Sequence, residues 1–432
     1  MAYEYDAGVD RRRPDAVVFP TRKEQVVEVV KLAGAEGVPF VARGAGTNLS
    51  GGSIPAKGGL IVEFARMNRI LELDIPNQRA VVEPGVINLD LNAALAEHGY
   101  FYAPDPASQK VSTMGGNVGE NSGGPHCLKY GVTTNHVLGL EVVLPDGELA
   151  RFGGKAFDAP GYDLTGLFVG SEGMFGLVTE ITVRILRQPE AVKTLLAVFN
   201  TIEDAADSVS AIIARGILPA TLEMMDKAVM EVVEASFHCG YPLDAEAVLI
   251  AEVDGLRDGL ERLAESITEI CRAHRAREVR AAKDAAEAAQ LWAGRRGAFG
   301  AIARLSPGYL TMDGTVPRTE LPRVLRGSLA IGRKYGLRAA NVFHAGDGNL
   351  HPLLLFDERD PAQAEAAHLA AMEILALCAS AGGTITGEHG VGLEKRAAMP
   401  LVFSEADLDA QKKVRAAFDP TGLCNPGKMF PD

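Results

Sequence analysis

The stretch that decides the fold is R-G-A-G-T-N-L-S-G-G, residues 43–52. It follows a predicted strand at residues 38–42, and the next residues, S-I-P, do not open a helix comfortably. It therefore differs from the dinucleotide fingerprint G-x-G-x-x-G, in which the glycines lead into a helix. The Walker pattern is also absent. A concave row of backbone N–H groups in such a loop can still cradle phosphate, and a plain connecting loop is the alternative.

Two further glycine clusters follow in the same region. They are S-T-M-G-G-N-V-G-E-N-S-G-G at residues 112–124 and G-S-E-G-M-F-G at residues 170–176. The chain has 47 glycines in 432 residues, or about 11% against a usual ~7%. Glycine lets a backbone approach a flat ring or a pyrophosphate closely. Three such clusters in one region predict ligand-binding loops rather than ordinary turns.

Length, composition and charge set the class of protein. A chain of 432 residues predicts more than one domain, because single cores stop growing near ~250–300 residues. Hydrophobic residues make up 47% and charged residues 23%, as in ordinary globular proteins. The net charge of -13 disfavours nucleic acid as a partner, because phosphate binding needs a basic face.

Cysteine usage and hydropathy indicate the compartment. The five cysteines are far apart and form no C-x-x-C, which argues against a disulfide framework, a zinc ribbon or an iron–sulfur cluster held by this chain alone. The N-terminus lacks a signal pattern, and no run of 18 apolar residues occurs, so no transmembrane segment is expected. We expect a cytoplasmic protein, with peripheral association with the inner membrane through partners left open.

Strands and helices alternate through the first part of the chain. T-R-K-E at residues 21–24 has capping-box spacing and predicts a helix that ends at Gly37. A second helix is predicted over residues 89–98. Residues 138–152 predict a hairpin with an Asp-Gly turn. From Pro189 the chain is richer in Ala and Glu and predicts a separate α+β domain. Its predicted strands are 194–200 and 247–252, and its helices are 203–215 and 255–273.

Further motifs occur in one order along nearly the whole chain, and together with the three glycine clusters they identify a family. They are Y-A-P-D-P-A-S (102–108), W-A-G-R-R (292–296), M-D-G-T-V-P-R (312–318), H-A-G-D-G-N-L-H (344–351), G-E-H-G-V-G (387–392) and F-D-P-T-G-L-C-N-P-G-K (418–428). With them the chain resembles the vanillyl-alcohol-oxidase or PCMH-type flavoproteins, and within these the glycolate and D-lactate dehydrogenase group.

The resemblance implies an α+β fold. Residues 1–188 would form a PCMH/VAO-type FAD-binding domain of two subdomains. Residues 189–385 would form an α+β, ferredoxin-like substrate or cap domain. Residues 386–432 would form a C-terminal segment that returns to the flavin site.

The resemblance also implies which residues bind FAD. Residues 43–52 would hold the pyrophosphate, and Asn425 would lie near the flavin ring. Because that loop has neither His nor Cys, we expect FAD to be bound non-covalently, although His126 and Cys127 could face the ring; loop residues without chemistry are the alternative. The residues expected to bind the cofactor are Arg43, Gly44, Ala45, Gly46, Thr47, Asn48, Ser50, Gly51, Pro84, Gly85, Pro104, Asp105, Ser108, Gly115, Gly116, Asn117, Glu120, Asn121, Ser122, Gly123, Gly170, Glu172, Gly176, Thr179 and Asn425.

Histidines gather in two of the motifs. A strand followed by a glycine bulge can turn His344 and His351 toward one point. Glu388 and His389 are adjacent and in an extended segment would point opposite ways. Two His and one carboxylate form a known metal-binding set, and a structural His pair is the alternative. The resemblance implies a divalent metal (Zn, Mn or Fe) on His344, His351 and Glu388, with His389 acting on the substrate hydroxyl, while Asp347 is expected in a turn.

The implied reaction is the FAD-dependent oxidation of a small D-2-hydroxy acid, glycolate or D-lactate, to the 2-oxo acid by hydride transfer to flavin. A planar guanidinium suits the substrate carboxylate, and the resemblance assigns this role to Arg295 rather than Arg296; a solvated helix charge is the alternative for either. Relatives acting on 2-hydroxyglutarate carry Lys and Asn where this chain has Thr311 and Leu353, so a small monocarboxylate is expected.

Electrons must leave the reduced flavin. A soluble acceptor or partner subunits, carrying iron–sulfur centres and a second flavoprotein, are expected. The alternatives are an oxygen-using flavin oxidase, a dehydrogenase of another acid such as D-2-hydroxyglutarate, and a non-catalytic flavin subunit of a complex. The presence of His344, His351, Glu388 and His389 together argues against the last.

Overall fold

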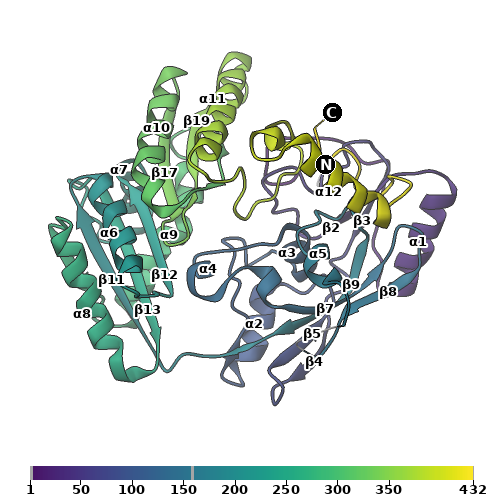
Figure 1. Ribbon diagram of the computed structural model, residues 1–432, viewed down its shortest axis with the longest axis horizontal. Helices are drawn as coiled ribbons and strands as arrows, with labels where there is room; N and C mark the ends of the chain where they lie inside the picture. Colours follow the sequence, from purple (N-terminus) through teal and green to yellow (C-terminus); the bar gives the residue numbers. More distant parts are fainter. Residues whose placement is uncertain (1–2, 157–159, 432) are drawn as a thin grey trace. The chain divides into compact units, whose positions relative to one another are not determined.

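The computed structural model describes residues 3–156 and 160–431 and divides the chain into two compact units (Figure 1). The first unit comprises residues up to 124, 130–188 and 388 onward, and the second comprises 125–129 and 189–387. Apart from the excursion at 125–129, the chain passes between units at 188/189 and at 387/388, where the sequence predicted 188/189 and 385/386. Residues 1–2, 157–159 and 432 of the predicted ranges lie outside the described residues. None of the helices in the described part of the chain combines the length and hydropathy needed to cross a bilayer.

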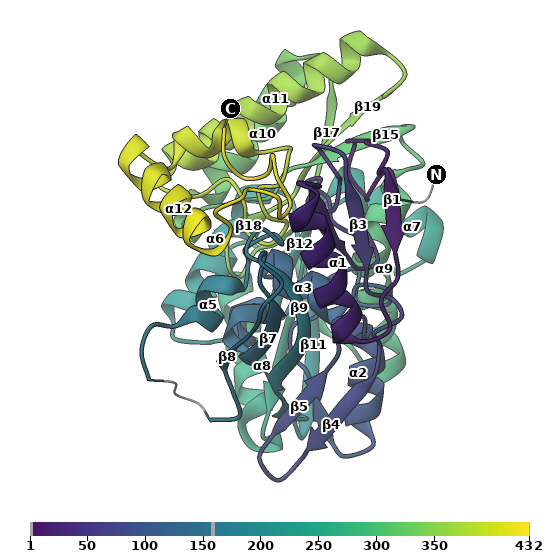
Figure 2. The same cartoon turned by 90° about the vertical axis from the view of Figure 1, so that its right-hand side faces the viewer.

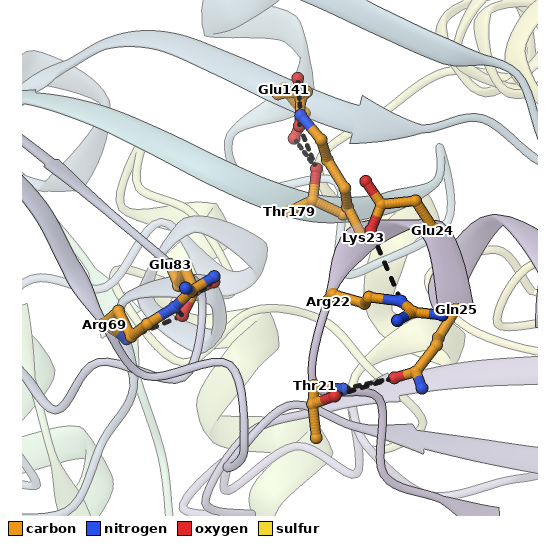
Figure 3. A network of polar contacts seen from close by, with 9 residues as sticks. All are labelled: Thr21, Arg22, Lys23, Glu24, Gln25, Arg69, Glu83, Glu141 and Thr179. Atoms are coloured by element: carbon orange, nitrogen blue, oxygen red, sulfur yellow. Dashed lines mark hydrogen bonds and ion pairs between the residues drawn. The ribbon is translucent and has the colours of Figure 1, made fainter.

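The first unit begins with a small parallel sheet, ordered β1 (Ala16–Val18), β3 (Leu60–Glu63) and β2 (Phe40–Arg43). Helix α1 (Lys23–Ala35) lies beside it (Figure 2) and buries Val26, Val30 and Ala33. The predicted helix is confirmed, but the predicted cap is wrong. Arg22 is the N-cap and its side chain caps nothing. Instead the amide and hydroxyl of Thr21 donate to Gln25 Oε1, at 2.8 and 3.1 Å (Figure 3).

The largest sheet of the first unit has five antiparallel strands, in the order β4 (Ile70–Asp74), β5 (Arg79–Val82), β9 (Leu177–Arg184), β7 (Val137–Val143) and β8 (Leu149–Gly153). The predicted hairpin is confirmed as β7–β8. The predicted second helix is confirmed as α2 (Asn88–Ala96). The apolar core between sheet and helices includes Leu91, Leu95 and Ile181, with Phe418 of α12 (Glu405–Phe418) packed against it.

A polar network ties α1 to this larger sheet (Figure 3). Lys23 Nζ lies 2.9 Å from Glu141 Oε1, and Thr179 Oγ1 donates to the same carboxylate oxygen over 3.1 Å. Glu141 is 5% exposed, so this carboxylate is largely desolvated and its bonds contribute more than surface ones. The network therefore ties α1, which packs beside the small parallel sheet, to the five-stranded sheet.

The second unit is built on one antiparallel sheet. Its strands run in the order β14 (Glu278–Ala281), β11 (Ala191–Phe199), β13 (Ala247–Gly255), β12 (Thr221–Asp226), β17 (Arg338–His344), β18 (Asn349–Leu350) and β16 (Gly314–Thr315). β19 (Pro352–Phe356) pairs with both β17 and β15 (Gly308–Thr311). The strands predicted at 194–200 and 247–252 are confirmed as parts of β11 and β13.

Helices cover both faces of this sheet. α6 (Ile202–Ala214), α8 (Arg257–Ala273) and α10 (Leu321–Lys334) pack on one face, α7 (Lys227–Phe237) and α9 (Ala285–Ile302) on the other, and α11 (Pro361–Ser380) packs on α10 (Figure 1). The helices predicted at 203–215 and 255–273 are confirmed as α6 and α8. The shorter elements are β6 (Tyr100–Phe101), α3 (Met114–Glu120), α4 (Cys127–Tyr130), α5 (Leu164–Phe168) and β10 (Leu186–Arg187).

Candidate functional site

In the second unit, α9 places Trp292 and Arg295 on the sheet. Residues three apart share one helix face, and each of these two finds a buried carboxylate. Trp292 Nε1 donates to Glu252 Oε2 over 2.7 Å, and Arg295 Nε donates to Glu223 Oε2 over 2.6 Å. The glycine between them is required, because a Cβ at Gly294 would come within 2.7 Å of neighbouring side chains. The motif W-A-G-R-R therefore docks α9 through two hydrogen bonds to carboxylates.

The two arginines of this motif have different surroundings. Arg295 is 3% exposed and lies against Glu223. Arg296 is exposed, and its guanidinium carbon lies 5.6 Å from the ring centroid of Trp292. Of the two candidates for binding a substrate carboxylate, only Arg295 thus belongs to a buried polar cluster, and the solvated-charge alternative does not apply to it.

Glu223 joins Arg295 to His344. Glu223 on β12 and His344 on β17 are directly opposite in register, and His344 Nδ1 lies 2.7 Å from Glu223 Oε1. Burial opposes ionisation of Glu223, but Arg295 and His344 together outweigh it and hold its pKa below the ordinary value. Nδ1 also lies 3.4 Å from Arg295 Nη2. The shorter contact is to a carboxylate, which can only accept, so Nδ1 carries the proton and Nε2 is the nitrogen with a lone pair.

His351 lies beside His344, as the glycine-bulge argument predicted. The two ring centroids are 5.2 Å apart, and both residues are buried. Gly348 takes φ +83° in the connection between the two strands. Asp347 accepts a hydrogen bond from the Asn349 amide over 3.0 Å, which confirms its role in the turn.

Asp313 is a member of this cluster that the sequence analysis did not single out. Its Oδ1 lies 3.5 Å from His351 Nε2. Its Oδ2 accepts from Thr386 Oγ1 over 2.6 Å and from the Gly387 amide over 3.0 Å. Asp313 thus lies beside His351, a predicted metal ligand, and binds Thr386 and Gly387, the last two residues of the second unit. Its place in M-D-G-T-V-P-R was the only signal for it.

Glu388 and His389 follow directly in the chain and belong to the first unit. Their membership in one ligand set with His344 and His351 therefore stays a prediction. The predicted extended segment is wrong. Residues 387–389 form a bend that Gly390, at φ +80°, continues. Glu388 Oε1 consequently lies 3.8 Å from His389 Nε2 rather than on the opposite side of the chain.

In the first unit, the loop at residues 43–52 is organised by its own side chains. Asn48 Oδ1 accepts from the amides of Ser50 and Gly52 over 2.9 and 2.7 Å. Gly46 and Gly51 have φ of +68° and +79°, a region that favours glycine. Arg43 is buried and donates to the Tyr5 carbonyl over 2.8 Å. Its guanidinium therefore anchors the loop, while its role in binding a cofactor stays a prediction.

The second glycine cluster differs from the predicted loop. Its centre is helical, α3 (Met114–Glu120), because Thr113 Oγ1 accepts from the Gly116 amide over 3.2 Å and so caps the first turn. The helix ends at Asn121, in the left-handed region at φ +54°. Asn121 Oδ1 accepts from the Thr134 amide over 2.8 Å, and Ser122 and Gly123 beyond it lie in neither helix nor strand.

The third cluster is linked to the C-terminal segment. Asn425 Nδ2 donates to the carbonyls of Gly52 and Glu172, over 2.9 and 2.6 Å. Lys428, which the sequence analysis did not single out, is 1% exposed. Its Nζ donates to the Gly52 carbonyl and to Asn425 Oδ1 over 3.2 and 3.1 Å. Burial lowers the pKa of Lys428 to about 8, against the opposing effect of Glu172. The C-terminal segment therefore cross-links two of the predicted cofactor loops.

Glu120 and Glu172 are the buried acids of these loops. Burial raises the pKa of Glu120 well above its ordinary value, and the neighbouring Glu172 raises it further. Burial also raises the pKa of Glu172, against the hydrogen bonds that it accepts from the Val391 and Gly392 amides. Two carboxyls so placed do not both ionise readily, and burial and the neighbouring carboxyl both favour the neutral form of Glu120.

Several buried polar atoms in these loops fit an absent ligand such as FAD. Four of them have no hydrogen-bond partner among the described residues, whereas buried polar atoms in proteins nearly always have one. Gly119 adds open space, since a Cβ there would meet nothing within 4 Å. Donors, acceptors and space thus occur together where the sequence predicted cofactor contacts. The four atoms are Ser112 Oγ, Asn117 Nδ2, Glu120 Oε2 and Ser171 Oγ.

At other predicted cofactor positions, neighbouring residues lie so close to a glycine that no side chain would fit there. A Cβ at Gly85 would come within 2.1 Å of the Phe64 carbonyl oxygen, and one at Gly115 within 2.6 Å of Pro84. Gly124, at φ +141°, lies against Asp105. The Thr179 hydroxyl is engaged with Glu141, so its side chain stabilises the sheet. All cofactor-binding assignments stay predictions, including those of Gly44, Ala45, Thr47, Pro104, Ser108, Gly170 and Gly176.

His126 and Cys127 lie on the second unit. His126 Nε2 is 3.4 Å from Glu252 Oε1, and its ring stacks on Trp292 with centroids 5.9 Å apart. His126 therefore belongs to the cluster that docks α9, and both alternatives for His126 and Cys127, facing the flavin ring or having no chemical role, stay predictions.

Comparison with known proteins defines the class. Residues 188–429 match the family described as FAD linked oxidases, C-terminal domain, and residues 14–153 match the one described as FAD binding domain. The chain belongs to the family of FAD-linked oxidases. It is thus an FAD-binding oxidoreductase with a PCMH/VAO-type fold, as the sequence predicted.

Individual relatives cover the whole chain. It is 47% identical over 432 residues to the glycolate oxidase subunit GlcD of Escherichia coli strain K12, a match that spans 100% of this chain and 87% of that protein. It is 31% identical over 421 residues to the mitochondrial D-lactate dehydrogenase [cytochrome] of Arabidopsis thaliana, spanning 97% of this chain and 74% of that one. These relatives support oxidation of a hydroxy acid.

Solved structures share the fold. 4-Ethylphenol oxidase from Gulosibacter chungangensis matches with a TM-score of 0.79 at 19% identity, covering 100% of this chain and 92% of that one. p-Cresol methylhydroxylase matches with a TM-score of 0.82 at 18% identity, with coverage of 100% and 92%. At this identity the likeness supports the fold and nothing about the substrate.

Proposed function

We propose that this protein oxidises a small D-2-hydroxy acid, glycolate or D-lactate, to the 2-oxo acid and passes the electrons through FAD to an external acceptor. The observation that carries the proposal is the buried group of Arg295, Glu223 and His344, with His351 beside it. A cation, an acid and two imidazoles in one desolvated cluster are typical of a site that binds and deprotonates an anionic substrate.

Arg295 is proposed to hold the substrate carboxylate. Its Nε is committed to Glu223, and the terminal nitrogens of the guanidinium carry further N–H donors in a planar fork. Glu223 fixes the plane of this fork, because it accepts from Nε over 2.6 Å. A carboxylate bound there presents C2 and its hydroxyl in a defined orientation.

His344, His351 and Glu388 are proposed to hold a divalent metal, and the second unit fits this role in part. Glu223 occupies the Nδ1 side of His344, so Nε2 is left as the ligand atom, as in carboxylate–histidine–metal arrangements. Imidazole nitrogens with a carboxylate suit Zn, Mn or Fe. A divalent metal, when bound, polarises the substrate hydroxyl.

His389 is proposed to accept the hydroxyl proton, since imidazole is the common base near neutral pH. FAD, bound non-covalently in the first unit, supplies the ring that accepts two electrons. The hydroxyl proton goes to His389, and the hydrogen on C2 leaves with both electrons of the C2–H bond. The substrate thereby becomes the 2-oxo acid, and FAD is the only oxidant that the reaction needs.

Two paired strand positions, Thr311 and Leu353, bear on the size of the substrate. Thr311 on β15 and Leu353 on β19 are directly opposite in register, and both are buried. Neither carries a charge or an amide that would bind a second carboxylate. The pair therefore favours a monocarboxylate over D-2-hydroxyglutarate.

The acceptor is proposed to be a partner subunit or a soluble carrier. The relative from Escherichia coli is named as a subunit of glycolate oxidase, which supports assembly with other chains. The five cysteines are far apart in the sequence and form no C-x-x-C, so iron–sulfur centres, if used, are proposed to belong to partners.

Dye-linked turnover on a panel of acids tests this proposal. We expect greater kcat/KM on glycolate or D-lactate than on D-2-hydroxyglutarate, and little peroxide under air. A preference for D-2-hydroxyglutarate would contradict the substrate assignment, and stoichiometric peroxide would identify an oxidase. No turnover on any 2-hydroxy acid by FAD-loaded protein would support the non-catalytic alternative.

A further inference from the structure

The segment that carries His389 is held by the loops assigned to FAD. The His389 carbonyl accepts from Asn48 Nδ2 and from Ser50 Oγ, over 3.1 and 2.9 Å. The Leu393 amide donates to the Ser50 carbonyl over 2.7 Å. The backbone on both sides of residues 390–392 is therefore fastened to the loop at residues 43–52.

Glycines allow this close packing. Gly390 and Gly392 have φ of +80° and +53°, where side chains are strained. A Cβ at Gly392 would come within 2.0 Å of the Ser50 carbonyl oxygen, and one at Gly390 within 2.4 Å of Glu120 Oε2. The spacing of glycines in G-E-H-G-V-G thus matches a segment pressed against the loops.

Glu172 is the acidic residue of the contact. Its Oε1 accepts from the Val391 amide over 2.6 Å and its Oε2 from the Gly392 amide over 2.8 Å. The residue is 4% exposed, so both hydrogen bonds are shielded from water. Asn425 binds the Glu172 carbonyl over 2.6 Å, which fixes the backbone from which the carboxylate extends.

We propose that Glu172 is a positioning residue that orients His389 for proton transfer, rather than a ligand of FAD. This inference rests on the proposed function and deepens it. Both carboxylate oxygens are directed at the backbone that follows His389. The loop at residues 170–176 therefore makes the proton acceptor and the cofactor-binding loops parts of one rigid body.

Glu172→Gln tests the assignment, because Gln keeps the size of the side chain but turns one acceptor into an NH₂ that faces a peptide N–H. We expect hydrogen–deuterium exchange at Val391 and Gly392 to become roughly tenfold faster, as for the loss of one charge-assisted hydrogen bond. At saturating glycolate or D-lactate, the rate constant of flavin reduction should fall about tenfold or more, with substrate Kd and FAD content unchanged. Glu148→Gln, on an exposed side chain, is the matched control.

The outcomes separate this inference from the proposed function. A Glu172→Gln variant that loses FAD would overturn it, because Glu172 would then serve the cofactor directly. Unchanged exchange, or unchanged reduction, would overturn it as well. A third outcome is faster exchange in the variant while no 2-hydroxy acid reduces the flavin of the wild type. It would support the hydrogen bonds from Glu172 to the segment after His389, but it would contradict both the proposed function and the role of His389 in it.

Discussion

The buried pair of Glu223 and Arg295 makes a strong prediction about stability. The two side chains are 0% and 3% exposed and their atoms are 2.6 Å apart. Glu223→Gln leaves the guanidinium of Arg295 without its buried counter-charge. Arg295→Gln leaves the carboxylate of Glu223 without the guanidinium that neutralises it. Removing one partner of a buried pair costs about 3–5 kcal/mol, because the remaining charge stays desolvated.

The double variant distinguishes this mechanism from a loss of packing. With both residues changed to Gln, no uncompensated charge remains, and the two amides can hydrogen bond to each other. We therefore expect the double variant to lose less than the sum of the single variants, by up to about 3 kcal/mol.

Urea unfolding monitored by tryptophan fluorescence measures these values. The chain has one tryptophan, Trp292, which is buried on the same helix as Arg295, so the signal reports the second unit. A chelator in all samples removes any contribution from metal binding. Arg304→Gln, on an exposed residue near the end of the same helix, should change stability by less than about 0.5 kcal/mol. Strictly additive losses, or single losses below about 1 kcal/mol, would refute the reasoning.

Three further predictions concern pH, cofactor and metal. Burial lowers the pKa of His136 from 6.5 to about 4. Between these pH values the unfolded chain binds a proton that the folded chain does not, so the free energy of unfolding falls by about 3 kcal/mol as the pH drops through this window. His136→Gln should flatten this pH dependence of stability, measured by circular dichroism in urea, and an unchanged slope would contradict the prediction. Acid precipitation should release FAD and leave a colourless pellet, whereas a yellow pellet would indicate a covalent link. Metal analysis should find about one divalent ion per chain and His344→Ala should lower its affinity at least tenfold; active, metal-free protein would remove the site.

Local patterns predicted several helices and strands of both units. The helices predicted up to Gly37, over 203–215 and over 255–273 correspond to α1, α6 and α8, and the Asp-Gly turn located the β7–β8 hairpin. The cap of α1 was wrong because Thr21 binds Gln25 from outside the helix instead of capping it. The glycine cluster at residues 112–124 was read as a loop, although a threonine cap and neighbouring packing are sufficient to make its centre helical.

The site was predicted less completely, because its partners are distant in sequence. The convergence of His344 and His351 was predictable from the short bulge between them. Glu223 was not, since it lies 121 positions from His344 on a strand whose pairing no local pattern reveals. The same holds for Asp313 and Lys428. In the sequence each looks like a charged surface residue, and only the folded structure shows that both are buried.

The central claim is that the substrate itself reduces the flavin of this protein. Its most direct test is to add glycolate or D-lactate to the FAD-loaded protein without oxygen and to record the visible flavin spectrum. The account predicts full bleaching by one of these acids in the wild type, and slow or absent bleaching in His389→Gln, whose flavin dithionite still reduces. An oxidised spectrum that persists in the wild type at saturating acid would contradict it.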